Sequence, residues 1–250
     1  LPCQALIPET TQAEVLVIAR QTGVLAGGPV AKMAFAHLDP AVSWQQEMPD
    51  GAMLSKGDCI AKISGPLRSL LTGERTALNF LTHLSGIASW TRQFVDAVNS
   101  SEVCILDTRK THPGYRVLEK YAVRAGGGTN HRMGIYDGCL IKDNHLAAWA
   151  SQLSEGQSPR IADAIKQARS QVAAGVSVEV EVDTLAQLQD ALAGQPDIVL
   201  LDNMLPDQLR QAVAIRNQLQ PQVLLEASGG ITLETIKAIA QTGVERISIG

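Results

Sequence analysis

The chain has 250 residues, of which 45% are hydrophobic, and its formal net charge at neutral pH is −4. This length suits one large α/β barrel or two smaller domains, and the apolar content is ample for a core. No apolar run reaches the length of a membrane span and no secretory signal opens the chain, so we expect no membrane association. A mildly acidic chain also lacks the broad basic face that nucleic acids require, and we expect no nucleic-acid partner.

The four cysteines are scattered without CxxC spacing, at Cys3, Cys59, Cys104 and Cys139. This pattern favours buried free thiols in a reducing cytoplasm over disulfides or a zinc site. The sequence begins at Leu1 without a methionine and stops at Gly250 directly after an apolar run, so we expect truncation at both ends.

The first hundred residues predict a small α+β domain. Strands are expected at residues 13–19 and 23–25, with turns at Asp50-Gly51 and Lys56-Gly57-Asp58. Two helices are expected over residues 67–81 and 87–98, broken near Ser85-Gly86. We place domain boundaries at 1–100 and 101–250, with the linker near 99–102.

From residue 103 onward, short β-rich runs alternate with amphipathic helical segments. The predicted strands are 103–108, 138–142, 176–182, 197–201, 222–227 and 246–250, and the predicted helices are 184–193, 206–219 and 232–242. Thr184 and Thr232 occupy N-cap positions. Repeated β/α units imply parallel strands covered by helices, and the lack of a GxGxxG motif favours an incomplete parallel α/β barrel over an open doubly wound sheet.

Charged side chains gather where these strands end. Five cationic or imidazole groups are candidates for a pocket that binds a small polyanion: Arg109, Lys110, His131, Arg132 and Lys142. The carboxyl ends of barrel strands are where active sites form. A lone histidine is more often structural, and His131 gains weight only from its neighbours Arg132 and the Gly126–Gly128 run.

The run Val178-Glu-Val-Glu-Val-Asp183 alternates strictly, which in a strand places three carboxylates on one face. We favour an inward-facing acidic row, compensated by Lys110, Lys142 or a divalent metal, over a solvated edge strand. Glu181 and Asp202 end successive strands and would suit Mg²⁺, bound directly or through water, although an ion-pair network with the lysines fits the same spacing.

Glycine-rich turns offer a phosphate cradle. Ser228-Gly229-Gly230 follows a strand and precedes the expected Thr232 cap, and Gly250 ends the next strand. Arg75 lies on an expected helix far from the barrel, so a functional Arg75 would act from the small domain or from a second subunit.

Five long segments closely resemble nicotinate-nucleotide pyrophosphorylase (carboxylating), the quinolinate phosphoribosyltransferase family. They are ERTALNFLTHLSGIA (74–88), ILDTRKTHPGYRVLEKYAVRAGGGTNHRMGIYDGCLIKDNH (105–145), EVEVDTLAQL (179–188), LLDNM (200–204) and LEASGGI (225–231). The resemblance covers nearly the whole chain. It implies an N-terminal α/β sandwich domain, an incomplete barrel, and a pentosyltransferase that joins quinolinate to phosphoribosyl pyrophosphate with Mg²⁺. The products would be nicotinate mononucleotide, pyrophosphate and CO₂, for NAD biosynthesis.

The resemblance also implies residue roles. The five cationic pocket residues would bind the quinolinate carboxylates and pyrophosphate, with Lys110 and Lys142 catalytic. Glu181 and Asp202 would be catalytic, facing the ribose and Mg²⁺. Ser228, Gly229 and Gly250 would hold the 5′-phosphate, and Arg75 would reach the neighbouring active site in a homodimer or a hexamer of dimers.

The chain departs from the family pattern at His112, where threonine is common, and at Tyr115, where leucine is common. The family's N-terminal helix and acidic segment, and the elements that finish its barrel, are absent from the sequence. Three alternatives remain: a ModD-like relative associated with molybdenum transport, a Schiff-base aldolase that uses Lys110 or Lys142, and a non-catalytic protein that binds phosphorylated metabolites.

Overall fold

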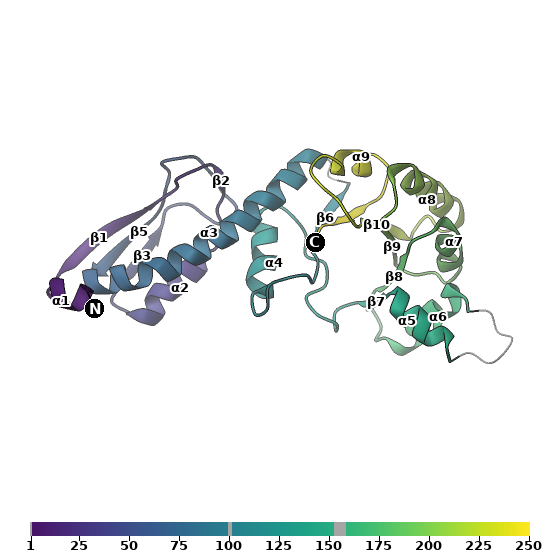
Figure 1. Cartoon of the computed structure of the whole chain (residues 1–250), viewed down its shortest axis with the longest axis horizontal. Coiled ribbons are helices and arrows are strands. Elements are labelled where there is room, and N and C mark those ends of the chain that lie inside the picture. Colours follow the sequence, from purple (N-terminus) through teal and green to yellow (C-terminus); the bar gives the residue numbers. More distant parts are fainter. Residues whose placement is uncertain (1, 100–101, 153–158) are drawn as a thin grey trace. The chain divides into compact units, whose positions relative to one another are not determined.

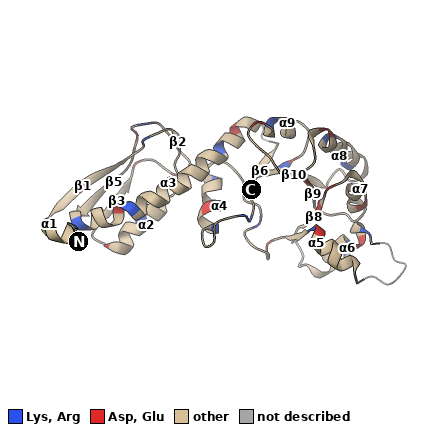
Figure 2. Ribbon diagram, viewed as in Figure 1, with Lys and Arg blue, Asp and Glu red and all other residues tan. Residues whose placement is uncertain are grey.

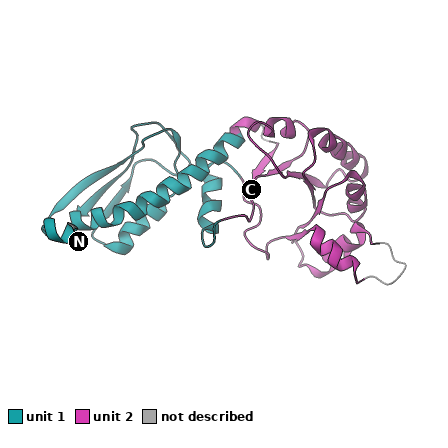
Figure 3. Ribbon diagram, viewed as in Figure 1, with its two compact units in different colours: residues 1–95, 112–128 teal, residues 96–111, 129–250 magenta. Residues whose placement is uncertain are grey.

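The computed structural model describes residues 2–99, 102–152 and 159–250, and the chain forms two compact units. Unit 1 comprises residues 1–95 and 112–128, and unit 2 comprises residues 96–111 and 129–250 (Figure 3). The segment 112–128 therefore returns to the first unit after the chain has entered the second. Ser100 and Ser101, inside the linker expected from the sequence, lie outside the described residues.

Unit 1 combines small antiparallel sheets with helices (Figure 1). A three-stranded sheet has the order β1-β5-β3, and β2 pairs with β4. The strands are β1 (Gln12–Ile18), β2 (Gly23–Val24), β3 (Ser43–Gln46), β4 (Met53–Leu54) and β5 (Cys59–Pro66). The helices are α1 (Pro2–Leu6), α2 (Gly28–Leu38), α3 (Leu67–Val98) and α4 (Arg116–Ala125). The α+β prediction for this part is confirmed, and the sequence analysis missed α1, α2 and α4.

The break expected near Ser85-Gly86 was wrong, because α3 is one helix of 32 residues. Ser85 Oγ accepts the backbone N–H of Ala26 at 3.0 Å and donates to the carbonyl of Ala26 at 3.1 Å. A Cβ added to Gly86 would meet no atom within 4 Å, so this glycine marks an open face of the helix. The tertiary bonds of Ser85 offset the weak helix propensity of this pair.

Unit 2 is built on a six-stranded parallel sheet with the order β6-β11-β10-β9-β8-β7. Its strands are β6 (Cys104–Leu106), β7 (Cys139–Ile141), β8 (Val178–Val182), β9 (Ile198–Asp202), β10 (Leu224–Ser228) and β11 (Arg246–Ser248). Its helices are α5 (Asp143–Ala150), α6 (Ile161–Gln171), α7 (Leu185–Ala193), α8 (Pro206–Leu219) and α9 (Ile236–Ala240). All six strands predicted from the sequence are present.

The strand order is that of a barrel cut at one seam. From β7 to β11 the strands follow the chain, and β6, the first in sequence, pairs with β11 at the far end. No pairing between β6 and β7 closes the sheet within the described residues. Parallel β/α units wound in this cyclic order fit the expected incomplete α/β barrel, with α6 and α7 contacting β8.

Of the two helix N-caps predicted from the sequence, one is confirmed and the other was wrong. Thr184 caps α7 as expected, because its Oγ1 accepts the N–H of Gln187 at 3.2 Å. Thr232 does not cap α9, which begins only at Ile236. Thr235 Oγ1 instead accepts the N–H of Thr232 at 3.0 Å, and this turn precedes the helix.

All four cysteines lie within the described residues and are free. The expectation that they are buried was wrong: Cys104 is exposed, and the other three are partly exposed. Over residues 2–99, 102–152 and 159–250, none of the helices has both the length and the apolar character needed to cross a membrane.

Candidate active site

The site begins at Asp107, which follows β6 and is buried. Its backbone N–H donates to the carbonyl of Thr129 at 3.2 Å. Its Oδ1 accepts the backbone N–H of His131 at 2.8 Å, and its Oδ2 accepts the side-chain amide of Asn130 at 2.7 Å. Asp107 therefore fixes residues 129–131 beside the end of β6. The sequence analysis assigns no role to Asp107, although a carboxylate near the end of a predicted apolar strand was the available signal.

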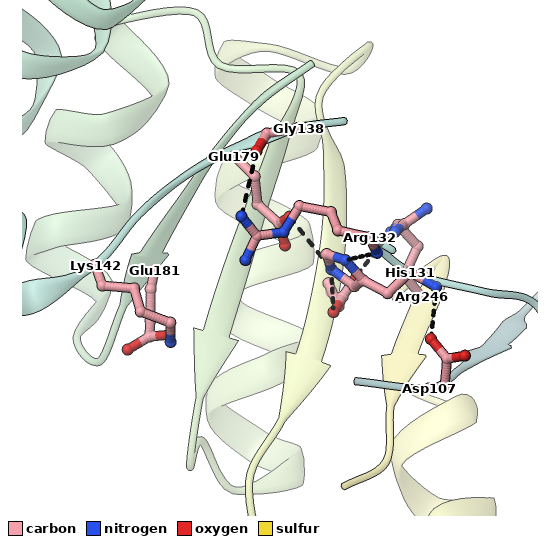
Figure 4. A network of polar contacts seen from close by, with 9 residues as sticks. Asp107, His131, Arg132, Gly138, Lys142, Glu179, Glu181 and Arg246 are labelled. Atoms are coloured by element: carbon pink, nitrogen blue, oxygen red, sulfur yellow. Dashed lines mark hydrogen bonds and ion pairs between the residues drawn. The ribbon is translucent and has the colours of Figure 1, made fainter. Parts of the chain in front are cut away.

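His131 lies between two buried carboxylates (Figure 4). Its Nε2 is 3.3 Å from Glu179 Oε2 on β8 and 3.3 Å from Glu226 Oε1 on β10. Burial alone would lower the pKa of His131, but hydrogen bonds and charge attraction from Glu179 and Glu226 outweigh it and raise the pKa to about 9. The two carboxylates therefore favour a proton on Nε2, while Nδ1 accepts the backbone N–H of Arg132 at 2.8 Å, a bond that needs this nitrogen unprotonated.

Arg246 on β11 completes this cluster, because its Nε donates to Glu226 Oε2 at 2.7 Å. Burial would raise the pKa of Glu226, and the His131 hydrogen bond together with Arg246 lowers it below its usual range. His131 and Arg246 thus both contact the buried carboxylate of Glu226, and His131 also contacts Glu179. Both groups are engaged within the protein, and the sequence analysis missed Arg246 and the pairing of Glu226.

The inward-facing acidic row is only partly confirmed. Glu179 is 3% exposed and pairs with His131, whereas Glu181 pairs with the ammonium of Lys142. Asp183 is exposed and lies beyond the end of β8, so the expectation of a third carboxylate in the row was wrong. Lys142, which follows β7, compensates the row as expected. The imidazole of His145 is structural, since its Nδ1 accepts the backbone N–H of Lys142 at 2.9 Å.

Arg132 carries an unmatched donor. Its Nη1 donates to the carbonyl of Gly138 at 3.2 Å, but its buried Nε has no hydrogen-bond partner among the described residues. A Cβ at residue 138 would lie 2.9 Å from Arg132 Cδ, so a larger residue there would force the Arg132 side chain to shift. A buried N–H without an acceptor is costly, and an anionic ligand would satisfy it.

The glycine turn after β10 is sterically constrained. Gly229 has φ +95°, and a Cβ there would lie 2.2 Å from Asn203 Oδ1. The backbone N–H of Asn203 donates to the carbonyl of Ser228 at 2.8 Å, which ties the ends of β9 and β10 together. Asn203 also donates its side-chain amide to Asp202 at 2.7 Å. The turn thus exposes backbone next to Asp202.

Gly250 and Lys110 lie side by side. A Cβ at Gly250 would be 3.5 Å from Lys110 Nζ, and the backbone N–H of Lys110 donates to Thr108 Oγ1 at 3.1 Å. Arg109, the preceding residue, is exposed. These residues form the β6–β11 part of the site, whereas Lys142 and Glu181 form the β7–β8 part.

Arg75 belongs to unit 1, so unit 2 does not contain it. It is exposed on α3 and lines a cavity of about 840 Å³ within unit 1, together with residues of β1.

In Figure 2, acidic and basic residues are interspersed over the described part of both units.

The sheet is a parallel α/β barrel, and basic side chains and a glycine turn lie at the carboxyl ends of its strands. These features are typical of one class of proteins, the α/β barrels that bind anionic ligands at that end of the barrel. Comparison with known proteins narrows the class. Residues 87–250 match the model of the quinolinate phosphoribosyl transferase C-terminal domain, and residues 1–85 match that of the N-terminal domain. The chain belongs to the quinolinate phosphoribosyl transferase family, as its motifs predicted.

Individual relatives agree with this assignment. A probable nicotinate-nucleotide pyrophosphorylase (carboxylating) of Bacillus subtilis is 44% identical over 250 residues, which cover 100% of this chain and 82% of that protein. The nicotinate-nucleotide pyrophosphorylase (carboxylating) of Mycobacterium leprae is 42% identical, over 99% of this chain and 84% of that protein. The crystal structure of NadC from Streptococcus pyogenes has a TM-score of 0.89 at 41% identity and covers 98% of this chain and 83% of that one. The two-part fold expected from the sequence is confirmed.

Proposed function

We propose that the protein transfers the phosphoribosyl group of phosphoribosyl pyrophosphate to quinolinate and decarboxylates the product to nicotinate mononucleotide. Membership of the family supports the reaction class. The observation that carries the proposal to this site is the buried Nε of Arg132, a cationic donor that lacks an acceptor in the part of the chain that the structure describes. Quinolinate has two carboxylates, and a guanidinium binds such a group through paired hydrogen bonds.

The remaining cations suit two polyanionic substrates. His131 and Arg246 are engaged with Glu179 and Glu226, so we assign the contacts to the substrate anions to Arg109, Lys110 and Arg132. These side chains offset the repulsion between quinolinate and phosphoribosyl pyrophosphate and hold them in contact. Lys142 is 45% exposed in its pair with Glu181, so a substrate anion can compete for its ammonium.

The carboxylates suit the charge that develops on the ribose. Departure of pyrophosphate leaves positive charge at C1, which Glu181 or Asp202 would stabilise electrostatically. The quinolinate nitrogen then forms its bond to C1 and becomes a pyridinium. The bond between C2 and the adjacent carboxylate breaks next, its electron pair stays on C2 beside the cationic nitrogen, and C2 takes a proton from water as CO₂ leaves.

Mg²⁺ remains part of the proposal. The donors fit this ion, because Glu181 and Asp202 supply carboxylate oxygens from the ends of the neighbouring strands β8 and β9. Asp202 is half-buried, and its Oδ2 accepts the side-chain amide of Asn203. A bound Mg²⁺ would neutralise charge on the leaving pyrophosphate.

The 5′-phosphate would lie against Ser228, Gly229 and Gly250, with the ammonium of Lys110 beside Gly250. We also propose a homodimer, or a hexamer of dimers, in which Arg75 serves the active site of a second copy. Its exposure on α3 and the cavity that it lines support this role. The free cysteines support a reducing, cytoplasmic location.

The test is an absorbance assay of quinolinate consumption with phosphoribosyl pyrophosphate and Mg²⁺. Consumption should require all three components. Lys142→Ala and Arg109→Ala should each lower turnover at least about a hundredfold, because each removes an electrostatic contact to a substrate anion. Lys166→Ala, an exposed lysine on α6, is the control and should keep normal turnover. Near-normal turnover in both active-site variants would contradict the assignment.

A further inference from the structure

A second polar cluster lies wholly within unit 1 and takes no part in the proposed reaction. It consists of His83 on α3, His112 in the loop before α4, and Glu119 in the first turn of α4. His83 Nε2 lies 3.1 Å and His112 Nδ1 lies 2.7 Å from the same oxygen, Glu119 Oε1. Two rings from separate elements thus converge on one carboxylate oxygen.

The carboxylate is held for this contact. Glu119 has a side-chain exposure of 9%, whereas the imidazoles of His83 and His112 are 37% and 75% exposed. The other oxygen, Oε2, accepts the backbone N–H of His112 at 3.3 Å, which leaves Oε1 to the two rings. This secondary bond orients the carboxylate in the way that outer groups orient metal ligands.

The His83 ring is positioned as well. It meets the His112 ring edge to face at a centroid distance of 5.8 Å, and it meets the Tyr115 ring in the same way at 5.8 Å. Tyr115 in turn stacks on Phe80 at 6.3 Å. Packing on an exposed face therefore keeps the nitrogen of His83 aimed at Glu119.

We propose that His83, His112 and Glu119 form a binding site for a divalent transition metal of the zinc type. The three ligand atoms lie within 4.8 Å of one another. Tetrahedral zinc, with bonds of about 2.0–2.2 Å, separates its ligand atoms by about 3.4 Å. Each of the two nitrogen–oxygen distances, 3.1 Å and 2.7 Å, therefore needs to widen by less than about 1 Å. The exposed ring of His112 has the freedom to make that adjustment.

The ligand types select the metal. Two imidazole nitrogens and one carboxylate oxygen suit zinc, whereas Mg²⁺ prefers oxygen ligands throughout. The metal would take the place of the ring protons that now face Oε1. Three protein ligands leave a fourth position open, and the exposure of His112 directs that position to solvent. A bound ion would cross-link α3 to α4 and so brace the segment 112–128 within unit 1.

The test is zinc binding by calorimetry to the whole chain, freed of metal, with thermal melting in parallel. One equivalent of Zn²⁺ should bind and raise the melting temperature, since a ligand that binds only the folded state stabilises it. His83→Gln and His112→Ala should each weaken binding at least about a hundredfold, because loss of a ligand should exceed the effect of losing an outer-shell group. His37→Gln, an exposed histidine of α2 in the same unit, should bind like the parent chain.

A second measurement needs no variant. Histidine ring signals in a nuclear magnetic resonance spectrum should respond to Zn²⁺ at His83 and His112 and stay unchanged at His37. Absence of zinc binding by the parent chain, or binding that persists in both variants, would overturn the proposal. Ring shifts confined to His131, which faces Glu179 and Glu226, would overturn it too, because the ion would then occupy the other unit.

Discussion

The raised pKa of His131 gives the sharpest test of the barrel interior. The perturbation is Glu226→Gln, which keeps the shape of the side chain and removes its charge. The pKa of His131 rises from 6.5 to about 9 in the native protein, a net difference of about 2.5. This difference corresponds to about 3 kcal/mol in favour of the protonated ring.

The two carboxylates should contribute about equally, since each lies 3.3 Å from Nε2. Burial opposes them, so each carboxylate contributes more than half of the net difference. Removal of one should therefore bring the pKa of His131 below about 7.8, and the cation of Arg246, left without its partner, should lower it further.

The assay is a nuclear magnetic resonance titration of the histidine rings, with His131 assigned by its absence from His131→Gln. Glu181→Gln is the matched control, because it removes a carboxylate at the ends of the same sheet's strands that pairs with Lys142 and makes no ion pair with His131. Its His131 should titrate near 9, as in the parent chain. Either of two results would refute the reasoning: a pKa of His131 near 6.5 in the parent chain, or the same pKa of His131 in Glu226→Gln as in the parent chain.

The same pKa fixes the sign of a stability effect. Because the folded pKa of His131 lies above the unfolded value, protonation stabilises the native state fully below about pH 6.5, and this stabilisation is lost as the pH rises through about 9. In urea unfolding, the free energy of unfolding should therefore fall over this interval by up to about 3 kcal/mol more in the parent chain than in His131→Gln.

Two further predictions concern local structure. Ser85→Ala removes both bonds to Ala26 and should lower the free energy of unfolding by about 1–3 kcal/mol in urea titrations, and an unchanged midpoint would contradict the account of α3. Gly229→Ala should lower the melting temperature more than Gly57→Ala does. Both glycines have φ near +100°, so the backbone strain of the two alanines should be similar. Of the two, only Gly229 would bring the new Cβ against an atom, Asn203 Oδ1 at 2.2 Å. Equal decreases in melting temperature would show that this crowding is unimportant.

The sequence predicted the barrel strands well because each has a strong local pattern. The alternating valines and glutamates of β8 identified an inward face, and Lys142 was a foreseeable partner for Glu181. Such signals lie within one segment or at the ends of neighbouring strands.

Features that depend on distant residues escaped prediction. The bonds of Ser85 to Ala26 span 59 positions, so nothing local to Ser85-Gly86 shows that α3 continues. Likewise Glu226 faces His131 from a strand almost a hundred positions later, and Arg246 joins from another. The roles proposed for Glu181, Asp202 and the other site residues stay predictions.

The return of residues 112–128 to unit 1 has a consequence for synthesis on the ribosome. Ala122 of α4 packs in one core cluster with Val24, Ala26, Leu84 and Ala88, so a nascent chain of 95 residues still exposes that apolar surface. By the time α4 emerges, β6 is already made, yet its partner β11 is about 140 positions away. Unit 1 can mature only after residues 96–111 of unit 2 have been translated, and unit 2 only after all of unit 1. Late, long-range closure of this kind slows folding and leaves nascent chains dependent on protection from aggregation.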